Sequence, residues 1–538
     1  MRAGKYASHR ALILYYIFRK VSRVKRIKVF FGNALLLAIA TLFMRTVSVV
    51  WGAYVSGRIG AEGMGLYSLI MSAYAFAVTL ATSGINLAVV RLVSEELALG
   101  NGRGAVFAMR RCLCFGLFFG ATAAALLFLL SGVIGENLLG DARTEMSLRA
   151  LSASLPFIAV SNVFSGYFAA VKRIYKNAAS AVVEQFIKIG LIYVLLGVLA
   201  PRGVEYACLA LVVGASVSEG ISFSYMLVLY LIDRRRHIKS TDDAPSGNFS
   251  RRMLGISMPI ALSAYLRSGL LTVEHVLIPR GLRLYGAGAS EALSLYGVIH
   301  GMVFPLVLFP AALCQTFASL IVPELSELKT KYKCIKESRH IKYIVSRSIK
   351  FGLMFAVLVF GVMIFFADEL GMLVYHNELC GKYIRIFGAL IPVMYLDTVV
   401  DGMLKGLGEQ LASMKYNIID SAASVLIVLF LVPKMGVDGY VICVFFTEIL
   451  NASLSIGRLL KVTGARFKIV EYAALPALSA LGAAAMSNLV LAPISVSPPA
   501  FLALGIFVLA ALYLLLSRLV GAISEGDLKW ARGIIRRR

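Results

Sequence analysis

The chain has 538 residues, of which 59% are hydrophobic and only 15% charged, and its mean hydropathy is +0.82. This composition excludes a typical soluble domain and indicates a polytopic membrane protein. The formal net charge is +25, but the Lys and Arg residues lie mostly between and outside the apolar segments. We therefore expect contacts with anionic membrane lipids and none with nucleic acid. The seven cysteines are scattered, with no histidine cluster beside them, so we expect no metal site.

The first 29 residues form a basic arm. Nine Lys and Arg residues lie between Arg2 and Lys28, and a short apolar patch from Ala11 to Phe18 interrupts them. The patch is too short to span a bilayer and has no convincing cleavage site after it, so we do not interpret it as a signal peptide. A basic amphipathic segment of this kind is expected to lie on the anionic cytoplasmic leaflet.

Fourteen segments are long and apolar enough to cross the membrane, if ~20 residues make one span. They are residues 30–57, 64–90, 112–131, 150–171, 180–200, 207–232, 255–278, 292–320, 346–367, 383–405, 415–432, 438–460, 470–491 and 499–523. All are too long and too uninterrupted for the strands of a barrel. The predicted fold class is therefore an all-α polytopic membrane protein with fourteen transmembrane helices.

The positive charges predict the orientation of these spans. With both termini in the cytoplasm, the cytoplasmic segments hold 42 of the 54 Lys and Arg residues and the outer loops hold nine. The remaining three, Arg45, Lys188 and Arg267, lie inside spans. We therefore predict a multi-pass protein of the cytoplasmic membrane with both ends on the cytoplasmic side.

The longest loops divide the spans into groups of six, six and two. The predicted units are the arm (1–29), an N-lobe of spans 1–6 (30–232), a cytoplasmic linker (233–254), a C-lobe of spans 7–12 (255–460), spans 13 and 14 (461–523) and a basic cytoplasmic tail (524–538). The linker contains Asp, Pro, Ser, Gly and Asn in close succession, as flexible segments do. No outer loop is long enough to fold as a catalytic domain, so we do not expect an enzyme.

The two predicted lobes resemble one another in sequence. Glu62 and Tyr67 recur as Glu291 and Tyr296, at an offset of 229 residues. Further matches, at an offset of 236, are Pro156 with Pro392, Gly166 with Gly402 and Glu184 with Asp420. Because an even number of spans separates the copies, they share one orientation. We predict two parallel six-helix repeats, a geometry found in alternating-access transporters.

Two arginines lie near the middle of corresponding spans. Arg45 is about 15 residues into the first span and Arg267 about 12 into the seventh, so at ~1.5 Å per residue they differ in depth by only a few Å. An arginine at such a depth is costly and usually faces a polar cavity. The pair therefore indicates a cavity between the two lobes that attracts anions.

The order of several short motifs resembles the multidrug/oligosaccharidyl-lipid/polysaccharide exporter superfamily. These motifs are the Gly-x-x-Gly-x-Gly-x-Tyr turn at residues 60–67 and the segments 83–91, 166–185 and 309–325. They are similar to the polysaccharide-biosynthesis branch, which includes stage V sporulation protein B-like proteins and is related to the lipid II flippases. The resemblance covers nearly the whole chain. It implies a V-shaped cavity lined by spans 1, 2, 7 and 8, with a groove for a lipid tail at spans 13 and 14.

In such a cavity, Arg45 and Arg267 would bind the pyrophosphate of a lipid-linked sugar, because the planar guanidinium group binds phosphate oxygens bidentately. The alternative is that each arginine ties two helices together through a carboxylate or a carbonyl. Arg58 and Arg91 lie at span ends, where they would rim the cavity. Extension of these long side chains towards the membrane surface explains their positions equally well.

Polar side chains within the spans are candidates for coupling to a cation or a proton. They are Glu219, Asp397, Asp401, Asn417, Asp420, Thr447 and Glu448. Asp397 and Asp401 share one face of span ten, although Asp401 is also explained as a solvated helix end. The resemblance implies a sodium ion between spans 7, 11 and 12, where Asp420 would lie. The coupling ion would be Na⁺ or H⁺, and no cofactor is expected.

The sequence therefore predicts a flippase that moves an undecaprenyl-pyrophosphate-linked oligosaccharide or a peptidoglycan precursor across the membrane by alternating access. No nucleotide-binding motif is present, so an ion gradient or the membrane potential would supply the energy. A single chain suffices for this mechanism. One alternative is a cation-coupled multidrug exporter, against which the paired arginines argue. A membrane-embedded glycosyltransferase or polymerase is disfavoured by the short outer loops.

Overall fold

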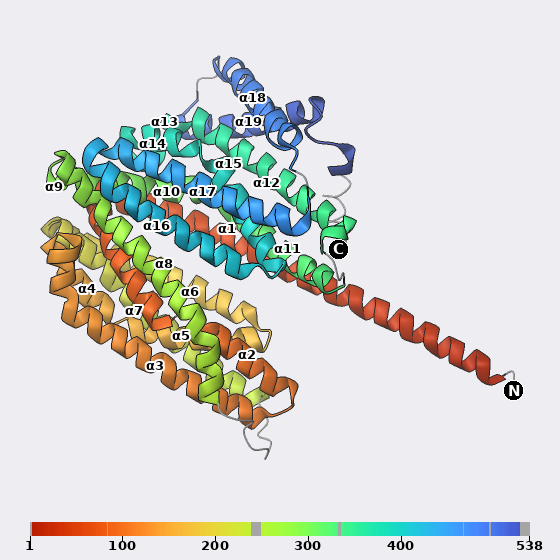
Figure 1. Ribbon diagram of the computed structural model, residues 1–538. Helices are drawn as coiled ribbons and strands as arrows, with labels where there is room; N and C mark the ends of the chain where they lie inside the picture. Colours follow the sequence, from red (N-terminus) through yellow and green to blue (C-terminus); the bar gives the residue numbers. More distant parts are fainter. Residues whose placement is uncertain are drawn as a thin grey trace.

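A computed structural model describes residues 3–82, 84–237, 249–331, 335–465, 467–493 and 496–527, with the side chains of residues 1–40 and 236–237 outside the description. Within these ranges every regular element is a helix, which confirms the all-α fold class. The helices form two groups, coloured orange to yellow and green to blue in Figure 1. We call them the N-terminal group and the C-terminal group.

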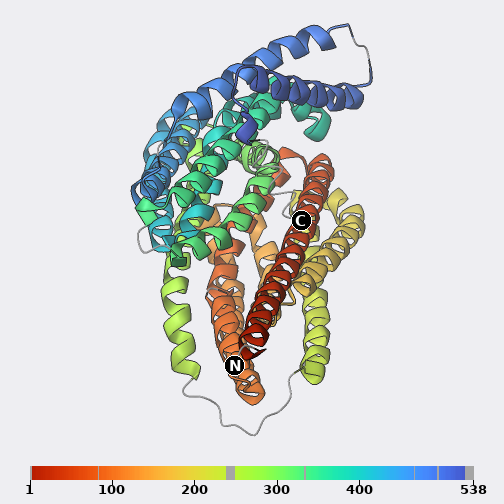
Figure 2. The same cartoon turned by 90° about the vertical axis from the view of Figure 1, so that its right-hand side faces the viewer.

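The N-terminal group contains the first seven α-helices. They are α1 (Ala3–Thr82), α2 (Ile85–Ala98), α3 (Gly102–Val133), α4 (Glu145–Ser152), α5 (Leu155–Ala170), α6 (Ile174–Leu199) and α7 (Val204–His237). A π-helical turn, η1 (Ile134–Leu139), and a 3₁₀ turn, η2 (Ala142–Thr144), join α3 to α4. The longest helix of this group is α1, with 80 residues, and its first part is the red helix in Figure 2.

The C-terminal group begins with α8, and a last pair of helices lies at its far edge in both views (Figures 1 and 2). Its helices are α8 (Phe249–Tyr285), α9 (Ala289–Tyr296), α10 (Phe304–Leu308), α11 (Ala311–Lys331), α12 (Arg339–Phe365), α13 (Ala367–Tyr375), α14 (Glu378–Gly388), α15 (Ile391–Gly406), α16 (Gln410–Met435) and α17 (Val437–Thr463). The last pair is α18 (Leu475–Leu491) and α19 (Pro498–Leu519). Helix α8 packs against α1 and α2 on one side and against α16 on the other, so it joins the two groups.

Every predicted span is helical over most of its length, although several are divided between two or more helices. In the described residues 11 helices are long and apolar enough to cross a membrane, or up to 13 if each of two bent pairs is one span. The first of them, Thr41–Ala98, covers residues 41–57 of the first predicted span and all of the second, and it changes direction at Gly60, whose φ is +69°. The protein is therefore a multi-pass membrane protein. The count of fourteen spans, the parallel repeat and the orientation of the termini stay predictions.

Prolines explain where predicted spans are broken. The fourth predicted span is the pair α4 and α5, bent by 46°, and the tenth is α14 and α15, bent by 56°. Pro156 and Pro392 each lie in the first turn of the second helix, where the missing N–H loses no helical hydrogen bond. The eighth span is shorter than predicted. It comprises α9, a π-helical segment η4 (Gly297–Val303) and α10, and Pro310 separates it from α11.

Helices α1 and α9 touch with almost no space at the predicted outer end. A Cβ atom on Gly65 of α1 would lie 2.0 Å from the carbonyl oxygen of Leu293, and one on Gly297 would lie 2.1 Å from that of Ala61. Both distances are far below van der Waals contact, so only glycine allows this approach. We call these two contacts the outer closure.

Hydrogen bonds reinforce the outer closure from both sides. Arg143 donates to the Glu62 carboxylate at 2.9 Å and to Asp141 at 2.7 Å. The Ser290 hydroxyl, just inside α9, donates to the other oxygen of Glu62 at 2.6 Å. Arg283 of α8 donates to the Gly140 carbonyl at 3.0 Å. The two groups of helices are therefore joined at this end.

At the predicted cytoplasmic end of the N-terminal group, the buried carboxylate of Asp233 holds three helices together. It accepts hydrogen bonds from the Tyr167 hydroxyl at 3.0 Å and the Lys176 ammonium at 2.6 Å, and it pairs with Arg173. The Asp233 side chain is only 1% exposed, whereas Arg173 and Lys176 keep partial access to solvent. The predicted linker begins here, but residues 238–248 lie outside the described ranges.

Replacing Asp233 with alanine is expected to lower the free energy of unfolding by ~2–3 kcal/mol, below the ~3–5 typical of fully buried pairs, because both cations are partly solvated. The measurement is denaturant unfolding of the detergent-purified protein. Glu327→Ala is the control, since the Lys331–Glu327 pair is exposed on both sides and such pairs contribute ~0–1 kcal/mol. Equal losses in the two variants would contradict the assignment.

Candidate functional site

The candidate site is built on the middle of α8, where that helix lies against α1. The Thr79 hydroxyl of α1 donates to the Ser268 hydroxyl at 3.2 Å, and the Thr272 hydroxyl donates to the Ser72 carbonyl at 3.0 Å. A Cβ on Gly269 would meet only Phe76, at 3.5 Å. Small and hydroxyl-bearing residues therefore allow α1 and α8 to pack closely along one face of α8. Arg267 lies next to this contact.

Arg267 and Arg45 both have exposed side chains. In the part of the chain that the structure describes, neither arginine has a hydrogen bond or an ion pair at contact distance, and the two are not brought into contact with each other. The nearby hydroxyls of Thr46 and Ser48 bond to carbonyls of their own helix. The expectation that each arginine ties two helices together through a direct contact therefore has no support in the described residues, and both guanidinium groups are accessible.

Acidic side chains of the C-terminal group lie within electrostatic reach of Arg267. The charge of Arg267 acts on the carboxyl groups of Asp397 in α15 and Asp420 in α16. Glu448 of α17 interacts electrostatically with both aspartates and with Glu274 of α8. We call Asp397, Asp420, Glu448 and Glu274 the acidic cluster. It lies on the helices that correspond to predicted spans 7, 10, 11 and 12.

The acidic cluster has unused hydrogen-bond acceptors. Asp397 accepts a bond from the Asn451 amide at 3.2 Å, but one oxygen of Asp420 and the Asn451 carbonyl oxygen are buried without a partner among the described residues. Such oxygens are the ligands that a small hard cation or a proton requires. Asn451 and Glu274 are absent from the sequence-based candidates. Helical spacing could have indicated Asn451, because it lies one turn after Thr447 on the same face of its helix.

Other predicted coupling residues are satisfied locally. Asp401 pairs with Lys405 at 2.5 Å and bonds the Ser413 hydroxyl, as expected for a helix end. The Asn417 amide donates to the Ser413 carbonyl at 3.0 Å, and the Thr447 hydroxyl donates to the Cys443 carbonyl at 3.0 Å. In the described ranges no three acidic, histidine or cysteine side chains converge closely enough to hold a metal ion.

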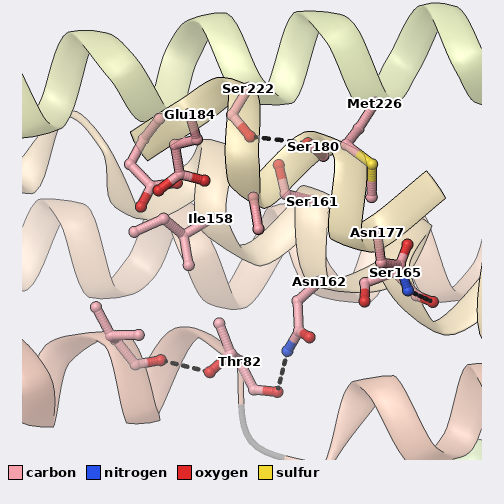
Figure 3. Close-up of a pocket in the computed structure, with 13 residues that line it drawn as sticks. Thr82, Ile158, Ser161, Asn162, Ser165, Asn177, Ser180, Glu184, Ser222 and Met226 are labelled. Carbon is pink, nitrogen blue, oxygen red and sulfur yellow. Dashed lines mark hydrogen bonds between the residues drawn. The ribbon is translucent and has the colours of Figure 1, made fainter. Parts of the chain in front are cut away.

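The remaining predicted residues lie elsewhere. The Arg58 guanidinium stands 5.5 Å from the centre of the Tyr54 ring. Arg91 pairs with Glu95 at 2.9 Å, and Glu95 also pairs with Arg252 near the start of α8. Arg91 therefore belongs to an ion-pair network between the two groups at the predicted cytoplasmic end. Glu219 lies on α7 in the N-terminal group, apart from the acidic cluster, and lines a cavity that is shown in Figure 3.

The fold defines a multi-pass membrane protein of two helical groups that meet along one joining helix, with accessible arginines and an acidic cluster between its spans. A family model described as polysaccharide biosynthesis protein matches residues 30–327, more than half of the chain. The chain therefore belongs to the polysaccharide biosynthesis protein family, in the superfamily of multidrug and polysaccharide exporters. The family assignment made from the sequence motifs is confirmed.

Individual relatives agree with this assignment. The chain is 24% identical to stage V sporulation protein B of Bacillus subtilis, over 82% of this chain and 86% of that protein. It is 21% identical to the lipid II flippase MurJ of the same organism, over 76% and 78%. A solved structure of a lipid II flippase MurJ in an inward closed conformation covers 91% of this chain and 98% of its own, with a TM-score of 0.67 and 15% identity. The fold is thus that of the flippase and exporter superfamily.

Proposed function

We propose that the protein carries a lipid-linked saccharide, with a pyrophosphate between lipid and sugar, from one leaflet of the membrane to the other. The observation that carries this proposal is the accessible Arg267 guanidinium in the middle of α8, with no contact partner in the described residues. A cation in the middle of a span needs an anionic partner. A pyrophosphate group that enters between the two groups of helices would supply two phosphates for bidentate hydrogen bonds.

The relatives support the same class of substrate. MurJ is named a flippase of lipid II, and the family description refers to polysaccharide biosynthesis. Flipping makes and breaks no covalent bond, so this chain needs no catalytic residue for it. The second arginine, Arg45, would contribute from the first span. The lipid tail would stay in the bilayer while the head group crosses.

The acidic cluster would couple this movement to an ion. Asp397 and Asp420 attract Arg267, so they compete with a phosphate for the same guanidinium. A cation or a proton that neutralises the two aspartates would weaken this attraction and leave Arg267 to the pyrophosphate. Binding of the ion and of the head group would then favour each other, as linkage requires. The ion would be Na⁺ or H⁺.

The test is transfer between leaflets. Purified protein is reconstituted in liposomes with a fluorescent undecaprenyl-pyrophosphate-linked saccharide, and the fraction accessible to a membrane-impermeant quencher is followed over time. Transfer that exceeds that of protein-free liposomes is the expected result. Expulsion of a cationic dye without lipid transfer would favour the multidrug exporter. A change in saccharide length would favour the glycosyltransferase or polymerase.

Replacing Asp420 with asparagine is expected to make transfer less dependent on the Na⁺ or pH gradient, because one of the two charges that the ion neutralises is gone. The measurement is the ratio of transfer rates with and without each gradient, compared with wild type. Asp368→Asn is the control, since that carboxylate forms an exposed pair with Arg385 outside the acidic cluster. An unchanged ratio for Asp420→Asn would remove the acidic cluster from the coupling.

A further inference from the structure

A cavity of about 370 Å³ that is wide open to the surface lies between α1, α5, α6 and α7 of the N-terminal group. Seven of its thirteen lining residues carry a hydroxyl or an amide, and two more are glutamates. Figure 3 shows labelled serine and asparagine side chains entering it from several helices. So many groups that both donate and accept hydrogen bonds are unusual inside a membrane bundle, where polar residues are costly.

Part of this polar lining has no partner in the protein. The Ser161 hydroxyl and the Asn177 carbonyl oxygen are buried and make no hydrogen bond. By contrast, Ser180 and Ser222 bond to each other at 3.1 Å, and the Asn162 amide donates to the Thr82 carbonyl at 3.3 Å. A buried polar group left unsatisfied costs about 1–3 kcal/mol, so the two open positions indicate that something else fills them.

The charged side chains of the cavity are few. Glu184 and Glu219 are the two acidic residues of the lining, and Glu184 already has a counter-ion in Lys188, whose ammonium lies 3.4 Å away. The other polar lining residues carry neutral hydroxyl and amide groups. The lining therefore suits a neutral, strongly polar ligand that makes many hydrogen bonds.

The size of the cavity agrees with this. Sites for small organic molecules occupy about 300–1,000 Å³, whereas one water takes about 30 Å³. A bare cation would leave most of the space empty. A single sugar ring presents several hydroxyls around its edge, each of which can donate and accept, so its hydrogen-bonding pattern matches serine and asparagine side chains.

The cavity also lies next to the helix contact that carries Arg267. Val78 and Thr82 of α1 line it, and Thr79 between them bonds Ser268, the neighbour of Arg267. One segment of α1 thus has the cavity on one side and the candidate phosphate site on the other. The Tyr265 hydroxyl, also on α8, donates to the Leu80 carbonyl of the same segment at 3.3 Å.

We propose that the cavity binds one uncharged sugar ring. The inference rests on the proposed function insofar as the ring belongs to the head group whose pyrophosphate Arg267 binds. A free sugar would make the same hydrogen bonds, and the experiment below distinguishes it from a lipid-linked sugar as the ligand. The ring would satisfy Ser161 and Asn177 and would make the N-terminal group selective for the saccharide, while the arginines recognise the phosphates common to all such lipids.

The experiment measures equilibrium binding to the full chain in lipid nanodiscs. Three probes are compared: undecaprenyl pyrophosphate, undecaprenyl pyrophosphate that carries one N-acetylglucosamine, and free N-acetylglucosamine. Ser161→Ala is expected to weaken binding of the sugar-bearing lipid about 3- to 10-fold, the effect of one hydrogen bond. Binding of the sugarless lipid should not change. The thermal midpoint should not fall, because this hydroxyl makes no hydrogen bond in the protein.

Two further variants sharpen the test. Ala181→Phe places a ring in the cavity lining and should remove the preference for the sugar-bearing lipid. Ser224→Ala is the control, since that exposed hydroxyl on α7 bonds only the Gly220 carbonyl of its own helix. If free N-acetylglucosamine binds and Ser161→Ala weakens it, while the two lipids bind alike, the cavity is a sugar site whose ligand is the free sugar.

The inference is overturned if Ser161→Ala and Ala181→Phe leave the binding of all three probes unchanged. A second result also overturns it. In that case the wild type binds ²²Na⁺ in the absence of lipid, Glu219→Gln abolishes this binding, and added N-acetylglucosamine does not change it. Failure of the proposed function is a different result: neither lipid binds, and leaflet transfer is absent. The sugarless lipid therefore separates the two failures.

Discussion

Replacing Arg267 with alanine is expected to slow the transfer of a lipid-linked saccharide between leaflets by about 10- to 100-fold. Hydrogen bonds to a charged group contribute about 1.5–3 kcal/mol, and 1.4 kcal/mol corresponds to a factor of about ten. The guanidinium is accessible and has no contact partner among the described residues, so its removal breaks no hydrogen bond and takes away only its longer-range attraction to Asp397 and Asp420. Stability should therefore change little. The measurement is the initial rate in liposomes at equal protein insertion.

Arg267→Lys separates charge from shape. Lysine keeps the charge but lacks the planar fork that binds two phosphate oxygens at once, so a rate between those of wild type and the alanine variant is expected. Arg45→Ala should reduce transfer as well. Arg280→Ala is the matched control, because Arg280 is an exposed arginine near the C-terminal end of the same helix. If Arg267→Ala transfers lipid as fast as Arg280→Ala does, Arg267 has no part in recognition.

Replacing Gly65 or Gly297 with alanine is expected to abolish transfer by opening the outer closure. A single methyl group at either position would lie 2.0–2.1 Å from a backbone carbonyl oxygen. Backbone cannot move aside as a flexible side chain can, so α1 and α9 would have to separate. A transporter that cannot close one end cannot alternate. Hydrogen exchange of the peptides that span residues 57–70 and 288–303 should rise in both variants.

Gly57→Ala is the control for this prediction. Gly57 lies on the same helix, and a Cβ there meets nothing within 4 Å, so exchange and transfer should stay at the wild-type level. The substituted proteins must elute as folded monodisperse species for the comparison to count. Wild-type exchange together with wild-type transfer in Gly65→Ala would mean that the outer closure plays no part in the cycle.

Much of the fold could be predicted because hydropathy directly identifies the segments that cross the membrane. Each of the predicted spans is helical over most of its length, since a segment in lipid must satisfy its backbone internally. Where a span ends is less certain from sequence. The eighth predicted span runs to residue 320, yet Pro310 separates α10 from α11. An apolar sequence continues across that break, so hydropathy alone does not reveal it.

The candidate site was predictable in part. A charge inside an apolar segment stands out, which is why the sequence was enough to select Arg45, Arg267 and Glu448. Asn451 and Ser161 could not be selected in this way, because asparagine and serine are common in membrane helices and their meaning depends on what lies opposite. Asp401 is the opposite case. The sequence selects it as a coupling residue because it is an acid within a predicted span, but its carboxylate is already bound by Lys405 and Ser413.

Local hydrophobicity, charge placement and motif order were sufficient to assign the class of protein, the helical architecture and the family, because each of these properties can be read from one segment at a time. Which polar groups share a space depends on how the helices pack. The acidic cluster brings α8 together with α15, α16 and α17, which come much later in the chain. The cavity of Ser161 and Asn177 brings α1 together with α5, α6 and α7. The distance between two helices depends on contacts such as the close approach that Gly65 and Gly297 allow. Each such contact needs residues from both helices, so the sequence of one segment alone does not reveal it.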